Sequence, residues 1–317
     1  MIELILEAMS NFSRDGELQA NAIRTIRNER IIQEVDFDYF QACRMVIKTL
    51  FVFEDQPMIL RRISLCATLI NKMPIKQVSE LCTKKNVQKL LQILKQKSDN
   101  IDIVDSTLIV IINLSNESSS VCEIFVNEGG LELFIEILQS FPNASIRRYV
   151  LNLFRYIAKV EHLRHVLLRE DIIEHCRRLL LDSEFKVSYA AAGTLSHLAL
   201  ERNWGSCKQR IDILSSLHSK VLSWKNPGRV IRYRTFSSLF PLLELCDKPG
   251  VQLWVVWTLH YVCTENPSLK LHKEASDNCS MLQEEGGVDI LLHLLSSPEV
   301  HPDVNALAHK VLQILLD

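Results

Sequence analysis

The sequence has no long apolar run, little glycine or proline, and almost no net charge. Only 9 Gly and 9 Pro occur among 317 residues, which is too few for the many turns of a loop-rich all-β chain. The 36 basic and 38 acidic residues give a formal charge of −2, so the usual electrostatic basis for binding nucleic acid or an anionic membrane is missing. No apolar stretch approaches the roughly 20 residues of a membrane span. We therefore expect a globular protein without nucleic-acid or membrane partners.

Signals for export and for disulfide bonding are also missing. The first seven residues, MIELILE, carry acids where a secretory signal carries Lys or Arg. The 9 cysteines are an odd number and form no C-x-x-C pair. We interpret them as reduced, mostly buried thiols of an intracellular protein, located in the cytoplasm and/or nucleus.

Motifs for enzyme chemistry are absent as well. The chain has no glycine-rich phosphate loop and no G-x-S-x-G turn. One set of potential zinc ligands, His260, Cys263, His272 and Cys279, is an alternative that we weigh against core packing. His260 and Cys263 belong to a strongly apolar segment, which favours core packing. We expect no catalytic residue, no cofactor and no metal.

What the sequence does contain is an internal repeat. Residues 126–138 read VNEGGLELFIEIL and residues 283–295 read QEEGGVDILLHLL, so each has an acid, two glycines and apolar residues at helical spacing. Gly130 and Gly287 are 157 residues apart, close to four periods of about 40 residues, which is the period of armadillo and HEAT arrays. This spacing predicts an all-α, right-handed armadillo/HEAT-like superhelical repeat solenoid, in which each glycine pair supplies the sharp turn between two helices.

Further segments with apolar residues at helical spacing support this fold. We treat residues 1–317 as a single armadillo-like repeat domain, with less regular repeats in 1–100 and more regular ones in 101–317. The polar segment 268–278 lies where a repeat needs a tight link, and we predict a mobile loop there. The expected helices cover residues 37–53, 58–72, 87–96, 145–158, 170–181, 187–200, 251–263 and 302–316.

In such a solenoid the last helix of each repeat lines a concave groove that binds extended peptides. The residues at equivalent late positions of these helices are Asn113, Tyr156, His197 and Tyr261. Armadillo arrays typically place Asn at this position, where it hydrogen-bonds a peptide backbone, and only Asn113 keeps that type. The alternative is that the others fill space between helices. Trp254 and Trp257 have the same two interpretations, core or groove.

Several stretches of the chain, from about residue 27 onward, resemble the C-terminal armadillo-like domain of the zyg-eleven family. This resemblance implies a substrate-recognition subunit of a cullin-2 RING E3 ubiquitin ligase that reads protein N-termini beginning with glycine. It implies a non-catalytic adaptor, because partner subunits transfer the ubiquitin. The similar stretches are Arg30–Phe37, Leu90–Lys97, Gly130–Phe134, Tyr233–Leu243, Gly250–Trp257 and Cys279–Gly287.

In that family a separate N-terminal region, with an elongin-binding box and leucine-rich repeats, docks the ligase. Neither part occurs in these 317 residues. The resemblance therefore implies only the substrate-reading half, with the cullin-2 and elongin machinery reached through a region absent from this chain. An armadillo-like interaction scaffold without degron-binding activity is the alternative.

The family's pocket residues are only partly retained. The family pattern Trp-Asn-Leu-Thr-Asp-Glu matches residues 112–117, which read INLSNE. Asn113 is kept, Ile112 stands where the pattern has an aromatic wall, and Asn116 stands where an acid would meet the peptide's ammonium. The resemblance thus makes these three residues peptide-binding candidates with one charge missing.

A second family stretch, Asn-Asn-Ile-Ala-Glu-Val, matches residues 155–160, which read RYIAKV. Tyr156 replaces a polar amide and Lys159 replaces an acid. Because both acids of the pattern are lost and a cation is added, we expect binding of a free N-terminal glycine to be weak or absent.

Overall fold

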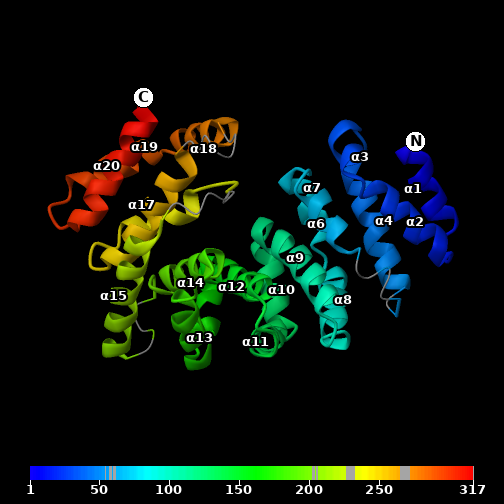
Figure 1. Ribbon diagram of the computed structural model, residues 1–317, viewed down its shortest axis with the longest axis horizontal. Coiled ribbons are helices and arrows are strands. Elements are labelled where there is room, and N and C mark those ends of the chain that lie inside the picture. Colours follow the sequence, from blue (N-terminus) through cyan, green and yellow to red (C-terminus); the bar gives the residue numbers. More distant parts are fainter. Residues whose placement is uncertain are drawn as a thin grey trace. The chain divides into compact units, whose positions relative to one another are not determined.

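The computed structural model describes the chain apart from residues 54, 57, 58, 60, 61, 202, 203, 205, 226–232, 265–271 and 317. In the part of the chain that it describes, the regular structure is helical and no strand occurs, which confirms the predicted all-α repeat fold (Figure 1). None of the described helices is long and apolar enough to cross a membrane. The chain divides into two compact units, Met1–Val160 and Glu161–Asp317, where the sequence was treated as one domain.

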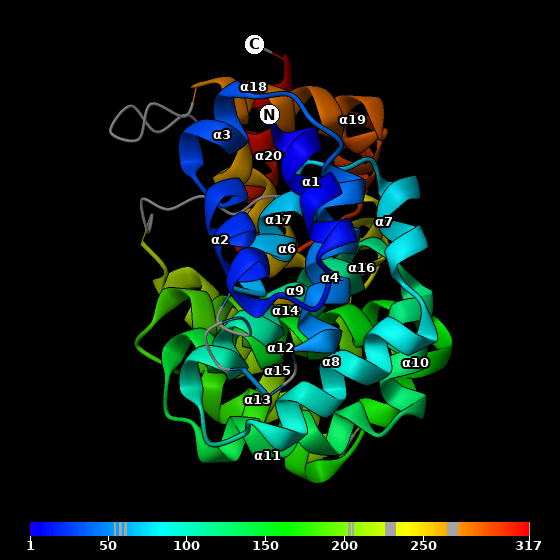
Figure 2. The same cartoon turned by 90° about the vertical axis from the view of Figure 1, so that its right-hand side faces the viewer.

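In the first unit, helices that follow one another along the chain stack in layers. α4 packs on α6, α6 on α9 and α9 on α12, while α8 packs on α10 at the outside of the same layers (Figure 2). The helices of this unit are α1 (Ile2–Asn11), α2 (Gly16–Ile26), α3 (Glu29–Glu34), α4 (Tyr39–Val52), α6 (Ser64–Ile70), α7 (Ile75–Leu81), α8 (Lys84–Gln96), α9 (Ile101–Glu117), α10 (Ser119–Asn127), α11 (Gly130–Ser140) and α12 (Ala144–Lys159).

The second unit repeats this design around one long apolar helix, α17. α17 packs against α15, α14 and α20, and most of its residues are buried, so it has no polar face. The elements are a 3₁₀ helix (Glu161–Leu167), α13 (Glu170–Leu180), α14 (Phe185–Leu198), α15 (Cys207–Ser223), a second 3₁₀ helix (Ser237–Leu239), α16 (Phe240–Leu243), α17 (Pro249–Cys263), α18 (His272–Glu284), α19 (Gly287–Ser296) and α20 (Pro302–Leu316).

The glycine pairs turn the chain as predicted. Gly129 and Gly286 have φ of 75° and 82°, in the left-handed region, and each directly precedes a helix. Their neighbours need glycine for a different reason, which is space. A Cβ on Gly130 would lie 2.8 Å from the carbonyl oxygen of Phe125, and one on Gly287 would lie 2.7 Å from that of Leu282. The first glycine of each pair thus supplies the backbone conformation and the second permits the close approach.

Polar side chains define where the long helices of the first unit begin. The Asn100 side chain accepts a hydrogen bond from the Ile103 backbone N–H at 3.3 Å, at the start of α9. Asn143 accepts from Ser145 and Ile146 at 2.8 and 3.3 Å, at the start of α12. These caps satisfy backbone donors that have no partner within the helix, so the sequence determines the first turns of both helices.

One predicted loop differs from the observed structure. Residues 268–271 lie outside the described part of the chain, but α18 begins at His272, so helix replaces the expected mobile loop from residue 272 to 278. Within α18 Ala275 and Leu282 are buried, at 4% and 0% exposure. These two residues are seven positions apart and therefore lie on the same face of the helix, which they anchor although its first half is polar in sequence.

Candidate functional site

α9 and α12 of the first unit run parallel. Near their N-terminal ends, burial raises the pKa of Asp105 on α9, and the positive charge of Arg148 on α12 partly offsets that rise. Near their C-terminal ends, Cys122 donates a hydrogen bond to the Ser115 carbonyl of α9 at 3.8 Å. Burial raises the pKa of Cys122 to about 12, against an opposing influence from Lys159 of α12. Both ends of the two helices therefore lie side by side.

This parallel arrangement brings the predicted residues of the first unit to neighbouring positions of α9 and α12, which we call the α9–α12 face. Asp105 and Arg148 are 43 positions apart in sequence, and in parallel helices the same offset places Asn113 beside Tyr156 and Asn116 beside Lys159. Asn113 is half-buried and Asn116 exposed, whereas Tyr156 is largely covered. Ile112, also half-buried, precedes Asn113 on α9. The five positions chosen from the sequence thus share one helix pair.

One polar contact of this face lies within α9 itself. The side-chain amide of Asn113 donates to the Ile109 carbonyl of its own helix at 2.8 Å. The Tyr156 ring is approached by two cations, the Arg155 guanidinium carbon at 5.2 Å and the Lys159 ammonium at 5.3 Å from the ring centroid. Both distances are within the range of cation–π attraction. Two cationic side chains of α12 therefore lie beside the Tyr156 ring.

The corresponding helices of the second unit carry aromatic rings instead. Trp257 and Tyr261 of α17 stack with ring centroids 5.0 Å apart and planes 10° apart. Phe185 of α14 lies 5.6 Å from Trp257, and Trp224, just after α15, lies 4.9 Å from Trp257. Trp257 and Tyr261 are each half-buried. Of the predicted groove residues in this unit, Tyr261 therefore belongs to a partly exposed aromatic cluster.

Hydroxyl groups fix the inner side of this cluster. The Tyr189 hydroxyl lies 2.6 Å from the Tyr233 hydroxyl and 3.0 Å from that of Thr258. Tyr189 is buried, at 5% exposure, with its ring 6.2 Å from that of Trp257. The aromatic cluster is thus anchored to α14 and α17 by buried polar contacts, which limits how far its rings can move.

His197 does not lie on an accessible face. It is 1% exposed, its Nδ1 is 2.8 Å from the Gly193 carbonyl of the same helix, and its ring meets Trp254 edge-on at 6.0 Å. The structure therefore corrects its assignment as a peptide-facing residue. His197 lies between packed helices, and the small residues 190–193 of the same helix let α14 approach its neighbours closely. Trp254 is fully buried and Trp257 is half-buried, so one tryptophan is core and the other is accessible.

The alternative zinc set is only partly assembled. Cys279 donates to the Cys263 carbonyl at 3.7 Å, so the two thiols are neighbours. The hydrogen bond with Cys279, followed by burial, raises the pKa of Cys263, which disfavours the thiolate that zinc requires. Burial lowers the pKa of His260. The His272 side chain is outside the described part of the structure.

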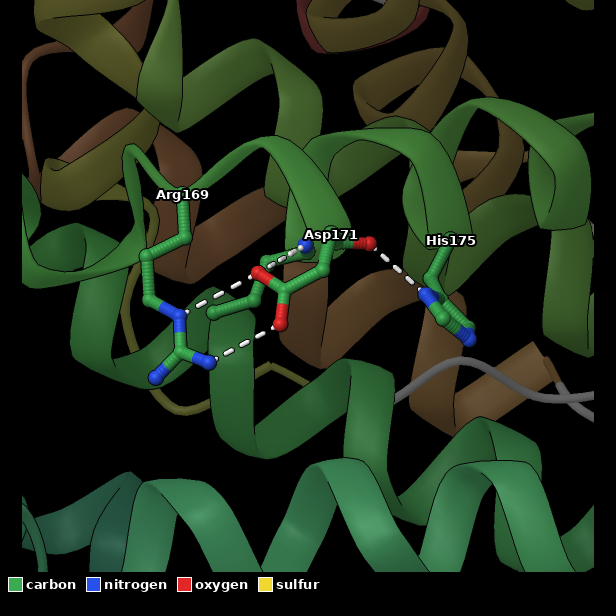
Figure 3. A network of polar contacts seen from close by, with 4 residues as sticks. Arg169, Asp171 and His175 are labelled. Carbon is green, nitrogen blue, oxygen red and sulfur yellow. Dashed lines mark hydrogen bonds and ion pairs between the residues drawn. The ribbon is translucent and has the colours of Figure 1, made fainter.

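A polar network at the start of α13 stabilises the first turn of that helix, and we do not treat it as a candidate site (Figure 3). Arg169 forms a two-pronged ion pair with Asp171, at 3.1 and 2.9 Å. The same carboxylate accepts from the Ile172 N–H at 2.9 Å, and the Asp171 carbonyl lies 2.7 Å from Nδ1 of His175. The ion pair with Arg169 lowers the pKa of Asp171. A carboxylate here satisfies backbone donors at a helix N-terminus.

A family model described as "Protein zer-1 homolog-like, C-terminal domain" matches residues 1–316. The chain belongs to this family. It is 26% identical over 324 residues to the protein zer-1 homolog of Pongo abelii, covering 99% of this chain and 41% of that protein. It is 29% identical over 231 residues to Zyg eleven-related protein 1 of Caenorhabditis elegans, covering 70% of this chain and 25% of that one. The resemblance found in the sequence is confirmed.

This member of the zer-1 homolog-like family spans about two-fifths of the length of the zer-1 homologs that it matches. Among solved structures it is similar to a designed armadillo repeat protein in complex with the peptide (KR)4. That similarity has a TM-score of 0.45 and 16% identity, and it covers 85% of this chain and 98% of the designed one.

Sequence reasoning missed two groups of residues in the second unit. Phe185 and Tyr189, like Trp257 and Tyr261, are four apart and therefore share a helix face, which is a signal that could have revealed the aromatic cluster. His218, His301 and Asp303 also lie together, but 83 positions separate the first two, and no local pattern connects them.

Proposed function

We propose that this chain is the substrate-reading domain of a cullin-2 RING E3 ubiquitin ligase, a non-catalytic adaptor that binds protein N-termini or extended peptides. The observation that supports the proposal is the α9–α12 pairing in a member of the zer-1 homolog-like family. It aligns Ile112, Asn113 and Asn116 with Tyr156 and Lys159, the positions that match the pocket pattern of the family. An intracellular location, in the cytoplasm and/or nucleus, is part of the proposal.

The chemistry of this face suits a peptide backbone. Asn113 and Asn116 offer amide groups that both donate and accept hydrogen bonds, as the repeating N–H and C=O of an extended peptide require. Ile112 adds half-buried apolar surface beside them, whereas Tyr156 is largely covered. In the second unit, Trp257 and Tyr261 offer separately a ring surface on which a side chain can stack.

The same face argues against a free N-terminal glycine as the preferred ligand. A charge-assisted hydrogen bond contributes roughly 1.5–3 kcal/mol. Replacing two acids by Asn116 and Lys159 removes two such partners, so binding weakens by about 3–6 kcal/mol, or on the order of 10²–10⁴ in affinity. The Lys159 ammonium near Tyr156 adds repulsion against a second amine.

Fluorescence anisotropy with a labelled Gly-initiated peptide and its N-acetylated form tests this specificity. We expect the two peptides to bind equally weakly, because no acid of the pocket pattern remains to favour the free amine. Tight binding of the Gly-initiated peptide that is lost on acetylation would show that the diverged pocket still reads glycine.

A combined variant, Ile112→Trp, Asn116→Asp, Tyr156→Asn and Lys159→Glu, tests whether these positions form the pocket. We expect it to bind the Gly-initiated peptide about 10²–10⁴ more tightly than the natural chain does. Lys95→Glu, on the exposed side of α8, is the matched charge control and should change nothing. A combined variant that folds, by circular dichroism, but gains no affinity would refute the assignment of the face.

A scaffold that has lost degron binding is the second candidate, and the positive charge around Tyr156 favours it. Affinity purification of the full gene product from cells, followed by proteomics, separates the two. Recovery of elongin and cullin-2 supports the ligase adaptor. Recovery of other proteins without ligase subunits supports the scaffold.

A further inference from the structure

Two imidazoles and a carboxylate meet at the start of α20, away from the α9–α12 face. His218 lies on α15, His301 directly precedes α20, and Asp303 is in the first turn of α20. Nε2 of His218 is 2.9 Å from Oδ2 of Asp303, and Nδ1 of His301 is 3.5 Å from the same oxygen. The two imidazole rings are 4.6 Å apart between centroids, at 69°. Three potential ligands from two helices thus converge.

Their spacing is close to that of a tetrahedral zinc site. With Zn–N and Zn–O bonds of about 2.0–2.1 Å, neighbouring ligand atoms of a tetrahedron are separated by about 3.3–3.4 Å. The two distances to Asp303 lie on either side of that value, and one ligand atom from each residue falls within 4.8 Å of the others. The two distances to Oδ2 of Asp303 need to change by a few tenths of an ångström to reach this value. The distance between the ligand nitrogens of the two imidazoles, which is within 4.8 Å, must reach it as well.

We propose that His218, His301 and Asp303 bind a zinc ion, with one coordination position left to water. Two nitrogens and one oxygen are a ligand set that zinc accepts, and three protein ligands with an open position are typical of accessible zinc sites. The His218 side chain is 17% exposed, whereas those of His301 and Asp303 are 41% and 40% exposed. The two ligands at the start of α20 are therefore the more accessible to water.

A hydrogen bond joins two of the three potential ligands, His218 and Asp303. A proton lies between Nε2 and Oδ2 at 2.9 Å, and zinc takes the place of that proton. Nδ1 of His301 accepts from the Asp303 backbone N–H at 3.2 Å, a long contact that zinc displaces. Among the described residues, the contacts given for both ligand nitrogens at this site are to Asp303, and zinc can replace them.

The surroundings of His218 limit the affinity. When Nε2 binds zinc, Nδ1 carries the hydrogen, and Nδ1 of His218 is buried without a hydrogen-bond partner among the described residues. Resident zinc sites hold that nitrogen with an outer acceptor, whose loss lowers affinity by about 10–100-fold. We therefore place the dissociation constant in the micromolar range.

Titration of the full chain with Zn²⁺ by isothermal calorimetry, and with Co²⁺ by visible absorption, tests the site. We expect about one equivalent to bind, with Co²⁺ bands of a four-coordinate ion and no thiolate charge-transfer band. Asp303→Asn and His301→Gln should each weaken binding at least 10-fold, since each removes one of three ligands. His309→Ala, an exposed histidine of the same helix, is the matched control and should bind like the natural chain.

Two further measurements keep the test decisive. Zinc at about 100 times its dissociation constant should raise Tm by about 5 °C in the natural chain and in His309→Ala, but by no more than about half as much in either ligand variant. A double Cys263→Ser, Cys279→Ser variant should bind zinc unchanged. Loss of binding in that variant, equal binding in Asp303→Asn and His301→Gln, or no binding at 100 micromolar (roughly 10–100 times the expected constant) would each overturn the proposal.

Discussion

The α9–α12 face of the first unit is polar and charged, whereas the α14–α17 face of the second is aromatic. Both faces are formed by long helices that pack side by side within their own unit. Asn113 and Lys159 represent the first surface, and Trp257 and Tyr261 the second. The difference teaches that buried positions determine the repeat, whereas the accessible positions of the same helices are free to take any chemistry that a partner requires.

The largest expected effect on the free energy of unfolding distinguishes core from surface positions among the aromatic residues of the second unit. Trp254→Ala should lower the free energy of unfolding by about 3–5 kcal/mol, because it leaves a cavity in a fully buried position. Trp257→Ala, at a half-buried position, should cost about 1–2 kcal/mol. Urea unfolding followed by circular dichroism measures both. Equal costs would mean that the aromatic cluster is core and offers no binding surface.

The glycine turns allow the two units to be compared directly. Gly129→Ala and Gly286→Ala should each cost about 1–2 kcal/mol, since both residues have positive φ. The double variant should show the sum to within about 0.5 kcal/mol, because the two glycines belong to separate compact units. Gly129→Asn is the control, and it should cost less because asparagine tolerates this conformation. Urea unfolding of the four variants would reveal any coupling as a departure from additivity.

The smallest effect concerns the first turns of two helices, α12, which the neutral Asn143 caps, and α13, where the carboxylate of Asp171 accepts from a backbone N–H. Asn143→Ala should cost about 1 kcal/mol at any pH, because the cap carries no charge. Asp171→Asn should cost less than about 1 kcal/mol at pH 7, since the carboxylate is partly exposed and its ion pair is screened.

The sign of the pH dependence follows from the direction of the shift. The pKa of Asp171 is lowered in the folded chain, chiefly by Arg169, so its contribution is present above the unfolded value of about 3.9. It disappears as the pH falls through the lower folded value. Urea midpoints measured between pH 7 and pH 3 should therefore converge for Asp171→Asn and the natural chain. A constant gap would contradict an ionic cap.

Much of the fold could be predicted from the sequence, because helical periodicity and glycine turns are local signals. The helix expected over 145–158 is observed as α12 (Ala144–Lys159), and that expected over 302–316 as α20. The division after Val160 could not be predicted, because it depends on contacts between distant helices. α18 was missed because its N-terminal half is polar and its anchoring residues are few.

The candidate site was predictable only in part. The family resemblance identified five positions on α9 and α12, and their parallel packing supports treating them as one face. His197 was misjudged because periodicity shows that a residue shares a helix face but not whether another helix covers that face. His218 and Asp303 come together through the tertiary packing of α15 and α20 around α17, and no sequence spacing encodes such a meeting.

The Lys159 ammonium beside Tyr156 can also be described as an intramolecular ligand of that ring. Lys159 lies at the C-terminal ends of two parallel helices, where their dipoles favour a positive charge. Because it is covalently attached, its effective concentration there is in the millimolar range or above. At the peptide site that we propose, a free peptide amine would have to displace this tethered cation, whereas a peptide whose first group is neutral or acidic would meet no such competitor.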